Sequence, residues 1–76
     1  MIFKISDNEL INDNVLGKIE IKQFHNQWAI EANTIQLHYD GKILGTYETK
    51  DRAQLELEYI YKAYSQGKTT YTMGVE

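Results

Sequence analysis

The two histidines, His25 and His38, titrate closest to neutral pH and are the first candidates for acid–base chemistry. His25 lies in a segment typical of a tight turn, and we interpret it as a turn residue. His38 lies in a segment that alternates like a strand, so the adjacent Tyr39 points to the other face and Asp40 lies in the predicted turn, and neither is placed to orient the His38 ring. A small enzyme would need His38 gathered in a cleft with Glu31 or Glu48, and this remains an alternative hypothesis.

The chain contains no sequence motif typical of nucleophilic or metal-assisted catalysis. Ser6 and Ser65 lack the Gly-x-Ser-x-Gly elbow. The absence of cysteine removes thiol chemistry and thiolate zinc sites. Asp7, Asp13 and Asn14 lack the spacing, glycine and terminal glutamate of an EF-hand loop. The glycines are too dispersed for a phosphate-binding loop, and we therefore predict no catalytic residue, no metal and no cofactor.

The composition indicates one small domain, spanning residues 1–76. Chains of this size bury only about 60% of their unfolded surface, which favours self-association in the absence of a disulfide or a metal. The net charge of −3 gives no basic field for nucleic acid. The apolar start of the chain is too short for a signal peptide, and no run is long enough for a membrane span. We expect a soluble, cytoplasmic homo-oligomer, a dimer or larger.

A helix is predicted over residues 50–65. Thr49 is a suitable N-cap, and Gly67 follows the last periodic residue as a C-terminal cap. Arg52 and Glu56 form an i, i+4 pair that we place on the outer surface. The 3.6-residue period predicts that one face packs, comprising Ala53, Leu57, Ile60, Tyr61 and Tyr64.

Alternating segments predict strands before this helix. Residues 1–5, 15–24 and 28–32 alternate, and a tight loop at His25 would place Ile21 opposite Ile30. Val15, Ile19 and Ile21 would share the apolar face of the second strand. The same register sets Glu20 opposite Glu31, a pair that flanking lysines would relieve.

The Asp40-Gly41 pair predicts a hairpin between residues 35–39 and 42–47, with Leu37 facing Leu44. Gly45 suggests a bulge in the second of these strands. Residues 69–73 read as a last, edge strand. The predicted fold class is α+β, a small antiparallel sheet of five or six strands with one helix packed on it and a short C-terminal strand.

Six residues are candidates for an interface or a ligand site. Leu55 and Tyr59 form an apolar i, i+4 pair on the flank of the helix away from the packing stripe. The remaining candidates are His38, Ile43, Tyr47 and Arg52. Arg52, Lys42 and Tyr47 would be the contacts of a small nucleotide-like ligand held at a subunit junction.

Three short motifs lie along the predicted strands, namely Trp28-x-Ile30-x-Ala32, Leu44-Gly45-x-Tyr47-x-Thr49 and Tyr71-x-Met73, and Ala53 and Leu57 lie between the last two. Together these motifs resemble those of small phage and prophage proteins of Gram-positive bacteria. The shared motifs are structural, so no active-site residue is carried over. The resemblance implies an accessory or host-takeover factor. Our hypothesis is a non-enzymatic binding protein that antagonises a host defence system by binding a host protein or sequestering its signal molecule. A nucleotide-like ligand sponge and a small enzyme are the alternatives.

Overall fold

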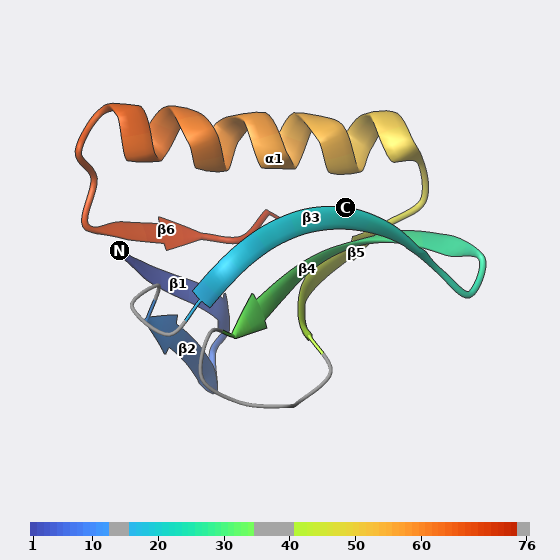
Figure 1. Ribbon diagram of the computed structural model, residues 1–76, viewed down its shortest axis with the longest axis horizontal. Coiled ribbons are helices and arrows are strands. Elements are labelled where there is room, and N and C mark those ends of the chain that lie inside the picture. Colours follow the sequence, from blue (N-terminus) through green and yellow to red (C-terminus); the bar gives the residue numbers. More distant parts are fainter. Residues whose placement is uncertain (13–15, 35–40, 75–76) are drawn as a thin grey trace.

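The computed structural model describes residues 1–12, 16–34 and 41–74. Its strands form two three-stranded sheets, ordered β2-β1-β6 and β3-β4-β5, and α1 lies across both (Figure 1). This confirms the α+β class, although the six strands divide into two sheets where the sequence suggested one. The elements are β1 (Ile2–Ser6), β2 (Glu9–Asn12), β3 (Leu16–Phe24), β4 (Gln27–Thr34), β5 (Lys42–Tyr47), α1 (Lys50–Ser65) and β6 (Thr70–Thr72).

Helix α1 begins and ends where local capping chemistry predicts. The Thr49 hydroxyl accepts a hydrogen bond from the Arg52 backbone N–H at 3.1 Å, which satisfies one of the free donors of the first turn. At the other end Gly67 adopts a positive φ of 70°. Its N–H donates to the Tyr64 carbonyl and the Lys68 N–H donates to the Ala63 carbonyl, each at 3.0 Å. These two bonds form a Schellman motif, in which the Ala63 and Tyr64 carbonyls of the last helical turn accept hydrogen bonds.

The antiparallel pair β3 and β4 has the predicted register. Ile21 lies opposite Ile30, and Glu20 lies opposite Glu31. Lys22 contacts both carboxylates, with its Nζ at 3.4 Å from Glu20 and 3.0 Å from Glu31, so the expected relief of the like-charge pair is confirmed. Val15, which was expected to begin this strand, lies outside the described residues.

Strand β5 pairs with β4 and contains the expected bulge. Ile30 lies opposite Gly45 but Glu31 lies opposite Ile43, so Leu44 is the extra residue. Leu44 and Tyr47 are three positions apart, and a regular strand would send them to opposite faces. The bulge brings both into the core.

The predicted strand 35–39, its turn at Asp40 and the pairing of Leu37 with Leu44 lie outside the described residues. Strand β6 lies at a sheet edge, as expected of the last strand, and pairs in parallel with β1, so that Tyr71 lies beside Phe3. The two sheets and α1 share one core of eight buried residues, which are Phe3, Ile30, Ala32, Leu44, Tyr47, Ala53, Ile60 and Met73.

The buried face of α1 differs from the predicted one. Its buried residues are Ala53, Glu56, Ile60 and Ala63, while Tyr61 is 74% exposed and Tyr64 is 43% exposed. The predicted burial of the two tyrosines is therefore wrong, as is the surface position predicted for Glu56. The helix is rotated so that alanines face the sheets, because small side chains allow its backbone close to them.

Candidate binding surface

Helix α1 keeps large apolar side chains exposed on both flanks of its buried face. On one flank Leu55 and Tyr59 are 40% and 48% exposed and lie one turn apart. We call this pair the Leu55–Tyr59 flank. Both residues were interface candidates from the sequence, and the structure brings them together at the surface. Leu57 lies two residues, or about 200° of helix rotation, beyond Leu55 and therefore belongs to the opposite flank.

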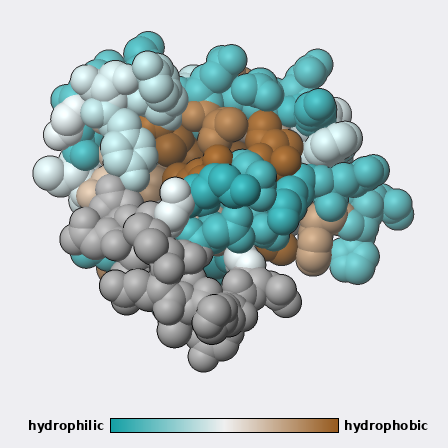
Figure 2. Space-filling view, in the orientation of Figure 1, coloured by the Kyte–Doolittle hydropathy of each residue, from teal (hydrophilic) through white to brown (hydrophobic). Residues whose placement is uncertain are grey.

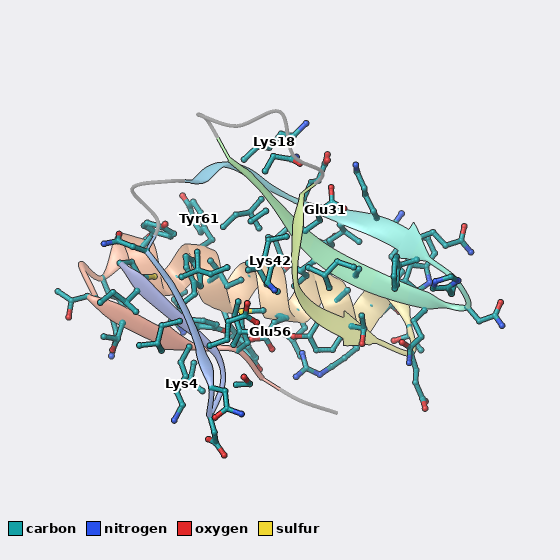
Figure 3. All side chains as sticks on the ribbon, turned by 90° about the horizontal axis from the view of Figure 1, so that it is seen from below. Lys4, Lys18, Glu31, Lys42, Glu56 and Tyr61 are labelled. Carbon is teal, nitrogen blue, oxygen red and sulfur yellow. The ribbon has the colours of Figure 1, made fainter. Side chains whose placement is uncertain are left out.

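On that opposite flank an apolar groove of about 420 Å³ separates α1 from β3. We call it the α1–β3 groove. Figure 2 shows hydrophobic surface between the helix and the front sheet at this position, and Figure 3 places Tyr61 on the β3 side of the helix. Sequence reasoning missed the groove because it assigned its aromatic residues to the core. The groove is lined by Ile19, Gln54, Leu57, Glu58, Ile60, Tyr61 and Tyr64.

The orientation of the helix depends on a buried carboxylate. Glu56 is 1% exposed and points from α1 toward the space between the two sheets (Figure 3). Its Oε2 accepts hydrogen bonds from the Tyr71 hydroxyl at 2.5 Å and the Gly74 N–H at 2.9 Å, while its Oε1 accepts from Arg52 Nη1 at 2.9 Å. The Tyr47 hydroxyl donates to the Gly74 carbonyl at 3.0 Å. We call these five residues the Glu56 network.

The charge of Glu56 is stabilised inside this network. Burial acts to raise the pKa of the carboxyl group, but the hydrogen bonds from Tyr71, Gly74 and Arg52 outweigh it and hold the pKa below its ordinary value. Burial and the adjacent carboxylate raise the pKa of Tyr71. Glu56 is therefore an ionised acceptor and Tyr71 a protonated donor at neutral pH. This assignment makes the network a structural clamp between the helix and the C-terminal strand.

Gly74 is fitted closely against this clamp. A Cβ atom at this position would lie 2.5 Å from Glu56 Oε1 and 2.9 Å from Arg52 Nη2. Such distances are closer than van der Waals contact allows, so a side chain at position 74 would displace the Glu56 and Arg52 head groups and disturb the hydrogen bonds of the clamp.

The three residues that the sequence suggested as contacts of a nucleotide-like ligand make contacts within the protein instead. Tyr47 is fully buried, so its predicted role at an exposed surface is wrong. The Arg52 guanidinium stacks on the Tyr47 ring, with its Cζ 4.7 Å from the centroid, and pairs with Glu56. Lys42 Nζ lies 2.6 Å from Glu9 of the other sheet. The cations expected to hold a nucleotide-like ligand are thus engaged within the protein.

The outer face of the β3-β4-β5 sheet is charged. Although desolvation acts to raise the pKa of Glu20, the ammonium groups of Lys18 and Lys22 hold it below its ordinary value. The hydrogen bond to Glu31 raises the pKa of Lys22. Ile43 lies opposite Glu31 on this face and is half-buried, and it is not part of the Leu55–Tyr59 flank.

The described residues contain neither a metal site nor a membrane-spanning helix, and the catalytic candidate His38 lies outside them. The structure therefore does not place His38 near Glu31 or Glu48. Within residues 1–12, 16–34 and 41–74, no three His, Asp or Glu side chains are grouped to hold a metal ion. Across the same ranges no helix has the length and apolar character needed to cross a membrane.

Comparison of the chain with protein-family models, with curated proteins and with solved structures found no match. The assignment of a function therefore depends on the surfaces described above.

Proposed function

We propose that this chain is a small non-enzymatic binding protein that recognises its target with the Leu55–Tyr59 flank of α1. The observation that carries the proposal is the exposure of two large apolar side chains, one turn apart, on a helix whose other face already packs on both sheets. Aromatic residues are enriched at protein interfaces because they bury a large area at a low entropic cost. The phage and host-defence setting rests on the resemblance alone.

The surroundings of this flank fit a partner with both apolar and polar contacts. Leu55 and Tyr59 share their side of α1 with Asp51 and Lys62, which are also exposed. An apolar centre with a charged rim is the usual composition of a protein–protein interface. A protein target is therefore favoured over a nucleotide-like ligand, whose expected cations Arg52 and Lys42 are held in internal ion pairs.

Affinity capture with matched variants tests the proposal. The tagged protein, the double variant Leu55→Ser/Tyr59→Ser and the control variant Leu10→Ser, which truncates an exposed leucine of β2, are exposed to a lysate of a Gram-positive bacterium. Retained proteins and the small molecules released on denaturation are then identified by mass spectrometry. We expect a protein that is retained by the native chain and by the control but lost with the double variant.

Purified target should then bind the native chain and bind the double variant at least about tenfold more weakly, since truncation of a central interface hot spot costs about 2 kcal/mol or more. Release of a nucleotide in place of a protein would support the ligand-sponge alternative. Equal retention of every species by the native chain and the double variant would contradict the proposal.

A further inference from the structure

Strand β3 is the longest strand described, with nine residues, and it lies at the edge of its sheet. Its register on β4 shifts between Leu16 and Lys18 and is regular over residues 18–24, which include every residue used below. Within the described residues it pairs with β4 and with no other strand. Alternate residues of an edge strand direct their N–H and C=O groups away from the neighbouring strand, which makes a long edge a template for pairing. The other described edges are shorter: β2 has four residues, β6 has three, and β5 has six with a bulge.

The α1–β3 groove lies beside this open edge. Ile19 of β3 lines the groove together with residues of the helix flank that carries Leu57 and Tyr61. A fourth strand added to β3 would extend the sheet under this flank of the helix. The same addition would satisfy the backbone groups of β3 and cover the apolar lining of the groove.

The charges on β3 match those of a second β3 strand. Lys18, Glu20 and Lys22 alternate along the outer face of the sheet. In an antiparallel pair with Ile19 opposite Ile19, Lys18 of each copy lies opposite Glu20 of the other. With Ile21 opposite Ile21, Lys22 lies opposite Glu20. The intermediate register sets Glu20 against Glu20 and Lys18 against Lys22, which is disfavoured because like charges repel across a strand pair.

We propose that two copies of this chain form a two-fold symmetric dimer by antiparallel pairing of their β3 strands. The dimer has a continuous six-stranded sheet, and the two-fold axis places both α1 helices on the same face of it. Tyr61 and Leu57 of each copy then cover the groove of the other. The Leu55–Tyr59 flank stays accessible on both copies, so the dimer is independent of the proposed target surface and presents it twice.

Sedimentation equilibrium of the native chain, up to about 1 mM, tests whether the dimer forms. We expect a species of twice the 8.9 kDa chain mass. The variant Glu20→Lys should raise the dimer dissociation constant at least about tenfold, because both favoured registers then oppose lysine to lysine. The same variant gives each monomer a Lys–Glu pair with Glu31 but removes the contacts of Lys18 and Lys22 with Glu20, so its circular dichroism spectrum should first match that of the native chain.

Three further variants make the test specific. The triple variant Lys18→Glu/Glu20→Lys/Lys22→Glu inverts every charge, keeps the pattern self-complementary and should restore the dimer. Tyr61→Asp should weaken the dimer, whereas Tyr59→Asp on the opposite flank should leave it intact. A monomer at every concentration would overturn the proposal and leave the groove to a different occupant. A dimer that is unaffected by both Glu20→Lys and Tyr61→Asp would also overturn it, since its interface would lie elsewhere.

Discussion

Glu56 illustrates how a single charged side chain holds this small core together. Its carboxylate is buried, and it receives donors from the helix, from β6 and from the segment after β6. A buried charge costs free energy unless it is fully hydrogen-bonded, and here both oxygens have donors. The network therefore specifies how α1 lies over the sheets at least as much as it adds stability.

Replacing Glu56 by alanine should destabilise the fold by about 3 kcal/mol, because Tyr71, Gly74 and the buried part of Arg52 lose their acceptor. The free energy of unfolding in urea measures the effect. Glu58→Ala, an exposed glutamate on the same helix, is the matched control and should change it by less than about 0.5 kcal/mol. Equal effects of the two substitutions would show that the Glu56 network does not form.

The depressed pKa of Glu56 predicts an acid-labile fold. Because the folded-state pKa lies below the unfolded value, the contribution is fully present above the ordinary glutamate pKa of about 4.3 and is lost as the pH falls through the folded pKa. Unfolding free energies measured from pH 7 down to about pH 3 should therefore fall more steeply for the native chain than for Glu56→Gln. Parallel curves would mean that the carboxyl pKa is the same in both states.

The sequence did not reveal that Glu56 is buried, for a physical reason. Arg52 and Glu56 have the i, i+4 spacing of an exposed helical ion pair, and the neighbouring residues in the sequence do not distinguish an exposed pair from a buried one. Tyr71 and Gly74, which bury the carboxylate, follow it by 15 and 18 residues. One signal was present, since Glu56 continues the periodicity of Ala53, Ile60 and Ala63.

At the level of elements, the predictions that succeeded depended on local chemistry. The ends of α1 follow from Thr49 and Gly67, and the register of β3 on β4 follows from a two-residue turn at His25 and Asn26. The rotation of α1 could not be predicted in the same way, because tyrosine is compatible with both buried and exposed positions. It is set by the two sheets and by the Glu56 network.

The N-cap offers a direct test at this scale. Thr49→Ala should cost about 1 kcal/mol, because the Arg52 N–H loses its side-chain acceptor. In a domain of this size that corresponds to a fall in melting temperature of about 4–8 °C, which calorimetry detects. Thr49→Ser keeps the hydroxyl and should retain most of the stability. An alanine variant as stable as the serine variant would argue against the cap.

At the scale of the whole molecule, two sheets share one core. Phe3 and Met73 come from the β1 side, Ile30 from the other sheet and Ile60 from α1. A buried cluster drawn from all these elements predicts that neither sheet is stable without the other, since three strands alone bury too little apolar area.

We therefore expect one cooperative unfolding transition, with equal calorimetric and van't Hoff enthalpies at a fixed protein concentration. The Glu9–Lys42 ion pair, which joins the two sheets, is partly exposed and should contribute under about 1 kcal/mol. Lys42→Met should consequently leave the transition single and shift it little. Two resolved transitions, in the native chain or in this variant, would show that the sheets unfold independently.

The parallel pairing of β1 with β6 also affects how the protein is made. Phe3 leaves the ribosome 68 residues before Tyr71, its neighbour in the sheet. Until then β1 has an unpaired edge and Glu56 lacks two of its donors. Folding of this domain must therefore follow synthesis of its last strand, and a nascent chain stalled before Thr70 should remain sensitive to protease.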